Sequence, residues 1–255
     1  MRWLSRSIDT LHEDLLKKRQ PAAAQPDFDV VVIGSGYGGA VAAARFARAG
    51  FTVCILERGR EYVPGEFPNQ LGDLAGHVRF RRSDWGGRIA NPLGLFDINA
   101  GPEVATLTGN ALGGGSQINA NVGIRADVKV LAQEHWPYAF RSDPNCLDGY
   151  YSEAERCLGI TPYPRNSLPR LVNLAQLARE MGETVRREDW DDLGEPDVRC
   201  APAPLAVTFA AGENRFGVKQ SACIECGDCV TGCNHWAKNT LTMNYLPDAV
   251  ASRRQ

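Results

Sequence analysis

One segment, FDVVVIGSGYGGAVAAARFARAGFTVCILE at residues 28–57, limits the fold of this chain more than any other. It begins with an apolar run rich in valine, which predicts a strand buried on both faces, as in a parallel sheet. Residues 38–50 predict a helix whose alanines pack close to that sheet, and residues 51–57 predict a second strand. The order strand, helix, strand indicates a right-handed βαβ unit and therefore an α/β fold.

The turn between the first strand and the helix has the spacing of a dinucleotide-binding loop. Gly34 permits the tight turn, Gly36 lets the backbone approach a pyrophosphate, and Gly39 lets helix and strand pack closely. The phosphates would lie at the helix N-terminus, where free N–H groups and the helix dipole favour anions. Glu57 ends the second strand 57 − 36 = 21 residues after Gly36, where an acid is expected to bind the adenosine ribose. We therefore predict a Rossmann-like FAD/NAD(P)-binding fold with a parallel sheet, although this loop alone does not separate FAD from NAD.

A second glycine-rich segment, LTGNALGGGSQINANVGIRAD at residues 107–127, adds to this prediction. Gly114 gives a backbone that a ligand can approach closely, while Ser116 and Asn119 provide polar groups to bind it. The pairing of this segment with the first loop favours FAD over NAD.

Four stretches resemble the glucose–methanol–choline (GMC) oxidoreductases: ERG at 57–59, REYVPGEFP at 60–68, LGGGSQINA at 112–120 and AKNTLTMNYLPDA at 237–249. The strongest similarity is to the cholesterol-oxidase-like bacterial branch, from about residue 28 onward. The resemblance implies FAD as the cofactor and oxidation of a CH–OH group by hydride transfer to the flavin, with Asn119 near the flavin end. It implies these FAD-binding residues: Gly34, Gly36, Gly39, Glu57, Arg58, Gly114, Ser116 and Asn119.

Members of that family continue into a substrate domain and a catalytic histidine that have no counterpart here. None of the four histidines lies where that base is expected, namely His12, His77, His135 and His235. The resemblance thus implies an incomplete fold, truncated before the substrate domain, with its catalytic residue unknown. The substrate would be a small-molecule alcohol, with sterols, sugars and simple alcohols all open. The alternatives are a flavin/iron–sulfur module completed by a second chain, or an inactive fragment.

Four cysteines have the spacing of a bacterial ferredoxin loop: Cys223, Cys226, Cys229 and Cys233. Thiolates at this spacing predict a [4Fe–4S] cluster, which would pass electrons singly to a one-electron acceptor. Asn234 stands where the ferredoxin pattern has proline, so a distant thiol such as Cys200 is an alternative fourth ligand. A three-iron cluster, zinc and a metal-free loop stay open as well.

The remaining regions have weaker patterns. We predict a helix and linker at 1–27, followed by an FAD-binding domain at 28–255 that includes a ferredoxin-like cysteine segment at 214–243. Within that domain we predict long ordered loop insertions at 58–103, helices at about 145–157 and 168–181, and a strand at 205–209.

Charge and hydropathy exclude several classes of partner. The net charge of −2 gives no electrostatic reason to expect nucleic acid. The longest uncharged stretch, 104–124, is rich in glycine and amide side chains, so no membrane span is predicted. The N-terminus lacks the apolar core of a secretory signal, which favours a cytoplasmic location with reduced cysteines.

Overall fold

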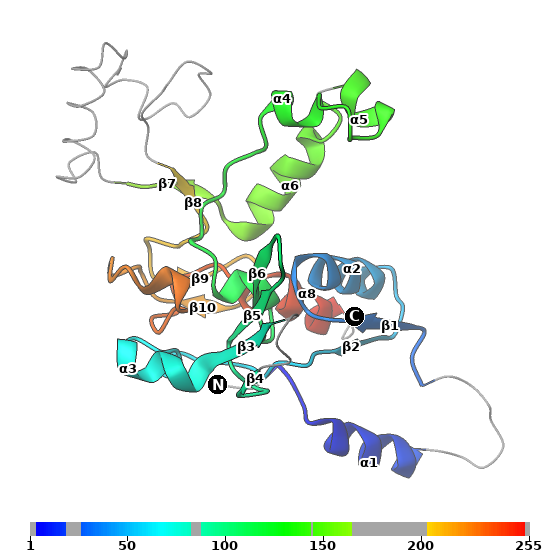
Figure 1. Ribbon diagram of the computed structural model, residues 1–255. Helices are drawn as coiled ribbons and strands as arrows, with labels where there is room; N and C mark the ends of the chain where they lie inside the picture. The colour runs from blue at the N-terminus through cyan, green and yellow to red at the C-terminus, as the bar shows by residue number, and fades with distance from the viewer. Residues whose placement is uncertain (1–3, 19–26, 83–87, 144, 165–202, 253–255) are drawn as a thin grey trace. The chain divides into compact units, whose positions relative to one another are not determined.

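The computed structural model describes residues 4–18, 27–82, 88–143, 145–164 and 203–252 (Figure 1). The chain divides into two compact units. The first comprises Met1–Ala120 together with Ala210–Gln255, and the second comprises Asn121–Phe209. All of the predicted FAD-binding residues and all four loop cysteines belong to the first unit.

The first unit contains the predicted βαβ unit. Strand β1 (Val30–Ile33) pairs in parallel with β2 (Val53–Leu56), and α2 (Tyr37–Arg48) connects them. The register runs from Val30 opposite Val53 to Ile33 opposite Leu56. Four alanines form the buried face of α2: Ala40, Ala43, Ala44 and Ala47. The predicted Rossmann-like α/β fold with a parallel pair of strands is therefore confirmed.

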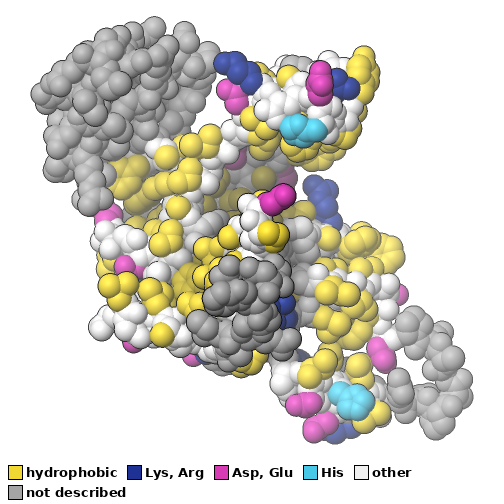
Figure 2. Space-filling view, in the orientation of Figure 1, with side chains coloured by type: hydrophobic (Ala, Val, Ile, Leu, Met, Phe, Trp, Pro, Cys, Tyr) yellow, Lys and Arg dark blue, Asp and Glu magenta, His cyan; other side chains and the backbone are white. Residues whose placement is uncertain are grey.

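Only one face of β1 is covered by the described residues. Val32 faces α2, because its Cγ1 lies 3.2 Å from the position that a Cβ on Gly39 would take. Val31 and Ile33 point the other way and are 56% and 88% exposed. The prediction that this strand is buried on both faces is therefore wrong for the described residues. Figure 2 shows hydrophobic side chains at the surface in this part of the chain.

Helix α8 (Tyr245–Ser252) packs beside α2 (Figure 1). Arg48 of α2 and Asp248 of α8 form an ion pair of 2.6 Å. Asp248 is largely buried, so this contact fixes the C-terminal described helix to the βαβ unit. Segment 237–249, which carries part of the GMC resemblance, is thereby brought to the cofactor loops.

A second sheet begins where long loops were predicted, at 58–103, and its last strand follows that stretch. Its strands are β3 (Val78–Arg82), β4 (Arg88–Ala90), β5 (Phe96–Ala100) and β6 (Ala105–Gly109), in the order β4-β3-β5-β6. Strands β3 and β5 are parallel, and the other two pairs are antiparallel. The loop prediction failed here because the strands are short and rich in arginine and polar residues, which hides their alternation. A hydrophobic core lies against this sheet: Tyr62, Phe67, Leu95, Phe96, Ala111 and Ile118.

The remaining elements of the first unit are short. The predicted N-terminal helix is present as α1 (Ile8–Lys18), and Glu61 holds the chain before it by accepting the N–H groups of Leu4 and Ser5. The others are α3 (Leu71–Leu74), η1 (Ala75–His77), η2 (Gly114–Gln117), β9 (Gly212–Glu213), β10 (Lys219–Gln220), η4 (Asp228–Val230) and η5 (Leu241–Met243).

The second unit contains α4 (Val128–Leu131), α5 (Tyr138–Ser142), α6 (Asp148–Leu158), β7 (Thr161–Pro162) and β8 (Pro204–Leu205). Helix α6 confirms the helix predicted at about 145–157, and the strand predicted at 205–209 is reduced to β8. The helix predicted at 168–181 lies outside the described residues. Among the helices that the structure describes, none is long and apolar enough to cross a membrane.

Candidate cofactor site

The three glycines of the first loop have different environments. Gly34 has a φ of +88°, which a residue with a side chain rarely adopts. A Cβ on Gly39 would lie 2.0 Å from the carbonyl oxygen of Gly34, so glycine is required where α2 meets β1. Around Gly36, in contrast, no atom of the described residues, apart from its chain neighbours, lies within 4 Å of the position that a Cβ would take. Gly34 and Gly39 therefore serve the fold, while Gly36 leaves open space beside the backbone.

The start of α2 is suited to binding an anion. Gly36 is its N-cap residue and provides no side-chain cap, and the first turn contains no acidic residue. The unpaired N–H groups and the helix dipole therefore favour a negatively charged group at this end.

The two glycine-rich segments, which are far apart in the sequence, meet at this place. A Cβ on Gly114 would lie 2.8 Å from the Cα of Gly36. The N–H group of Gly113 donates a hydrogen bond of 2.9 Å to the hydroxyl of Ser35. Gly113 and Gly114 have φ angles of +92° and +53°, so glycine suits both positions. The structure thus brings together Gly36 and Gly114, two predicted FAD-binding residues, in one surface.

Ser35 connects this surface to Glu57. The Ser35 side chain is fully buried, and its hydroxyl and N–H group donate hydrogen bonds of 2.6 and 2.9 Å to Oε2 of Glu57. Oε1 of Glu57 accepts the N–H group of Gly59 at 2.7 Å. Sequence reasoning missed Ser35, although a small polar residue between two loop glycines could have indicated a link to the strand-end acid.

Replacing Ser35 with alanine is expected to lower the free energy of unfolding. The buried N–H group of Gly113 would lose its acceptor, and Glu57 would lose a donor, which costs about 1–3 kcal/mol. Urea unfolding measures this loss, with Ser142→Ala at an exposed position as the matched control. A Ser35→Ala variant within about 0.5 kcal/mol of the wild type would contradict the buried link.

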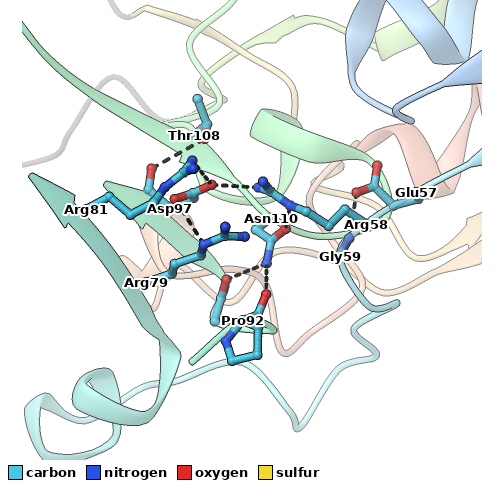
Figure 3. A network of polar contacts seen from close by, with 10 residues as sticks. Glu57, Arg58, Gly59, Arg79, Arg81, Pro92, Asp97, Thr108 and Asn110 are labelled. Atoms are coloured by element: carbon cyan, nitrogen blue, oxygen red, sulfur yellow. Dashed lines mark hydrogen bonds and ion pairs between the residues drawn. The ribbon is translucent and has the colours of Figure 1, made fainter. Parts of the chain in front are cut away.

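Arg58, which follows Glu57, joins this turn to the second sheet (Figure 3). Its guanidinium donates to Asp97 at 2.6 Å and to Oδ1 of Asn110 at 2.9 Å. Asp97 is almost fully buried in β5, and Arg81 and Arg79 of β3 lie 3.3 and 3.8 Å from its carboxylate. One buried carboxylate thus holds three guanidinium groups.

Asn110 completes this network from the other side. Its side-chain amide donates to the carbonyl oxygens of Pro92 and Gly94 at 3.1 and 3.0 Å. Close packing adds to it, because a Cβ on Gly59 would lie 2.3 Å from the backbone of Asn110. The ERG turn therefore has a fixed conformation, with the Arg58 side chain about half exposed beside Glu57.

The other two predicted cofactor residues differ in what their side chains do. The Ser116 hydroxyl is buried; it donates to the carbonyl oxygen of Gly113 at 2.7 Å and accepts the N–H group of Leu241 at 3.1 Å. Asn119 donates to the hydroxyl of Tyr37, at the start of α2, at 2.7 Å. Burial raises the pKa of Tyr37, and the hydrogen bond from Asn119 acts against this rise. Ser116 thus fixes the segment to η5, and Asn119 lies near the end of α2 that favours anions.

The four predicted metal ligands lie on one loop around η4. Burial raises the pKa of the Cys223 and Cys229 thiols; the Glu225 N–H group opposes the rise at Cys223, and the Lys238 ammonium opposes it at Cys229. Charge on the neighbouring thiols contributes to both rises in pKa. Within the described part of the chain, no group of three His, Cys, Asp or Glu side chains is arranged to hold a metal ion. The thiols as they stand therefore do not fit a cluster.

Asn234 stands where the ferredoxin pattern has proline, and it anchors this loop to residues 65–67 of the first unit. Its Oδ1 accepts the N–H groups of Gly65 and Phe67 at 2.7 and 3.2 Å, and its amide donates to the carbonyl oxygen of Phe67 at 3.1 Å. A Cβ on Gly232 would overlap the Phe67 ring at 1.9 Å. A proline at 234 would provide none of these three hydrogen bonds.

Comparisons with known proteins agree with this geometry. A family model described as an FAD binding domain matches residues 29–62. The chain is 32% identical over 237 residues to a protein named cholesterol oxidase from Mycobacterium tuberculosis, covering 87% of this chain and 37% of that protein. The chain is a GMC-like FAD-binding portion.

Other relatives of this GMC-like chain support the same conclusion. A cholesterol oxidase from Acinetobacter baumannii is 31% identical, over 86% of this chain and 38% of its own length. An uncharacterized GMC-type oxidoreductase from M. tuberculosis is 30% identical, over 98% of this chain and 37% of its own length. The chain therefore spans little more than a third of the curated relatives that it matches. FAD as cofactor and the GMC resemblance are confirmed, whereas the individual contacts to the cofactor stay predictions.

Proposed function

We propose that this GMC-like chain holds FAD for the oxidation of a CH–OH group in a small alcohol. The observation that supports the proposal most is the meeting of Gly36 and Gly114 beside the Ser35–Glu57 hydrogen bonds. Open space next to Gly36 suits a pyrophosphate, and Glu57 lies at the expected ribose position. When bound, FAD would supply a two-electron hydride acceptor.

Each part of the site has a proposed task in binding. The start of α2 would hold the diphosphate, because it offers N–H groups without a side chain in the way. The N–H groups of Gly113 and Gly114 are used by Ser35 and Ala111, so this segment would contribute close backbone approach instead. Glu57 would bind the ribose hydroxyls, and Arg58 would face the adenosine end with its exposed half. Asn119 would lie toward the flavin, as the family resemblance implies.

A sterol is the substrate that we propose, since two of the relatives carry the name cholesterol oxidase. The oxidation needs a base within hydrogen-bond reach of the alcohol oxygen. We assign no such base within this chain. His77, for example, packs against Tyr62, and burial, followed by the charge of Arg60, lowers the pKa of His77. About two thirds of the relatives' length has no counterpart in this chain. We propose that the base and the residues that surround the substrate belong to a region equivalent to that part.

The test combines cofactor binding with flavin reduction. The chain, incubated with FAD and separately with NAD, is expected to retain FAD, as measured by quenching of flavin fluorescence. Anaerobic mixing of the flavin-loaded chain with sterols, sugars and short alcohols is expected to leave the flavin oxidised. Tight NAD binding without FAD binding would refute the assignment of FAD as the cofactor. Flavin bleaching that one substitution within 1–255 abolishes would show that the chain carries its own base.

The cysteine spacing is the remaining support for a [4Fe–4S] cluster on Cys223, Cys226, Cys229 and Cys233. Because the described thiols do not form a ligand set, no electron-transfer step is assigned to this loop. Iron and sulfide analysis after anaerobic reconstitution tests the cluster directly. Metal content that is unchanged in Cys226→Ser, or zinc in place of iron, would exclude it.

A further inference from the structure

The buried ammonium group of Lys238 joins the LGGGSQIN segment to the loop that carries the four cysteines. The Lys238 side chain is 3% exposed, and its ammonium group donates three hydrogen bonds, all to backbone carbonyl oxygens. Two of these acceptors belong to the LGGGSQIN segment: Gln117 at 3.0 Å and Asn119 at 2.7 Å. The third is Cys229 of the cysteine loop, at 2.8 Å. A single nitrogen therefore connects two segments about 110 residues apart in sequence, 229 − 119 = 110.

The three bonds matter because their donor is charged and withdrawn from water. Hydrogen bonds from an ammonium group are stronger than those between neutral groups, and its desolvation is compensated only while the acceptors stay in place. The three donors of Lys238 are all engaged by these carbonyls. A shift of the cysteine loop would therefore remove an acceptor from Lys238 and disturb its hold on residues 117–119.

Neighbouring contacts fix the chain on either side of Lys238, so that Lys238 directly links residues 117–119 to Cys229. Segment 238–242 is already fixed to the cofactor segment, since the N–H group of Leu241 donates to Ser116. The far end of the cysteine loop is fixed by Asn234 to residues 65–67. Between these anchors, the Cys229 carbonyl is held by Lys238.

We propose that Lys238 is a positioning residue that couples FAD binding to the chemical state of the cysteine loop. The inference rests on the proposed function, because it takes residues 117–119 as part of the FAD site. Coupling between two sites acts in both directions: if bound FAD stabilises the loop in this position, then a modification of the loop thiols that displaces the loop weakens FAD binding.

The experiment measures both directions of this coupling. N-Ethylmaleimide labelling of Cys229 is followed by mass spectrometry, without FAD and at saturating FAD, and FAD affinity is measured by fluorescence quenching. In the wild type, FAD is expected to slow the labelling. In Lys238→Met, FAD affinity should fall by about tenfold or more, as expected for lost charged hydrogen bonds. FAD should then no longer slow the labelling of Cys229, even at saturating concentration. Lys238→Arg should recover part of both, and Lys219→Met, at an exposed lysine of β10, should change neither.

The outcomes separate this inference from the proposed function. A wild-type chain that binds no FAD would refute the proposed function itself. If the wild type binds FAD, and Lys238→Met binds FAD with the same affinity and the same protection of Cys229 from labelling, then only the role of Lys238 is overturned. If Lys238→Met does not fold, the wild type labelled with N-ethylmaleimide gives the answer. Its FAD affinity should be at least about tenfold weaker, and an unchanged affinity would overturn the coupling.

Discussion

Gly36→Val should abolish FAD binding while the chain stays folded. Gly36 has a φ of −65° and a ψ of −173°, which valine adopts without strain. Beyond its chain neighbours, no atom in the part of the chain that the structure describes lies within 4 Å of the new Cβ. The branched side chain would instead fill the space proposed for the pyrophosphate. We expect FAD affinity to fall by about a hundredfold or more, which corresponds to about 2.8 kcal/mol. Fluorescence titration measures this fall, and circular dichroism checks the fold.

A neighbouring glycine gives the opposite expectation and so sharpens the test. A Cβ at Gly39 would lie 2.0 Å from the Gly34 carbonyl oxygen, so Gly39→Ala should destabilise the chain by about 2–3 kcal/mol even without cofactor. Gly149→Val, at an open and exposed position in α6, should affect neither property by much. FAD affinity that is unchanged in Gly36→Val would contradict the placement of the pyrophosphate.

Asp97→Asn should produce the second large effect, on both stability and cofactor binding. The substitution removes the buried negative charge that holds Arg58, Arg79 and Arg81 together, and leaves three guanidinium groups facing one another. Breaking a buried ion pair costs about 3–5 kcal/mol, and partial exposure of the arginines reduces the expected loss to about 2–3 kcal/mol. FAD affinity should fall too, because Arg58 would no longer fix the turn that follows Glu57.

Urea unfolding and FAD titration of the same preparations measure these two effects. Glu103→Gln, at an exposed carboxylate in the loop between β5 and β6, is the matched control and should change stability by less than about 0.5 kcal/mol. An Asp97→Asn variant as stable as this control would show that the arginines do not depend on the carboxylate. An Asp97→Asn variant with unchanged stability and weakened FAD binding would show that Asp97 supports cofactor binding and not the stability of the fold.

The sequence predicts the βαβ unit well because its pattern is local. An apolar run, a glycine loop and an alanine-rich helix follow one another within residues 28–57, and the structure places all three as predicted. The uncovered face of β1 was not foreseen, since an apolar run does not reveal which elements will cover it. Strands β3 to β6 escaped notice because three to five residues, with arginines in β3 and β4 and polar residues in β5 and β6, are too short to show a clear period.

Contacts within the candidate site depend on long-range approach, which no local pattern specifies. Glycines at 36 and 114 were predicted separately as cofactor residues, and only the structure shows that their backbones touch. Several of the polar side chains that hold the site together were not predicted. Ser35, Asp97 and Lys238 take their roles from partners 9 to 121 residues away, which the sequence does not name.

The hydroxyl of Ser35 links the two glycine-rich segments before any ligand binds. It donates to Glu57 and accepts from Gly113, so the residue proposed to bind ribose and the backbone next to Gly114 depend on the orientation of one hydroxyl group. A change that turned this hydroxyl away from Glu57 would therefore loosen the Gly113 N–H group as well. Because both hydrogen bonds are already in place, the two segments are organised in advance, and cofactor binding would not have to order them.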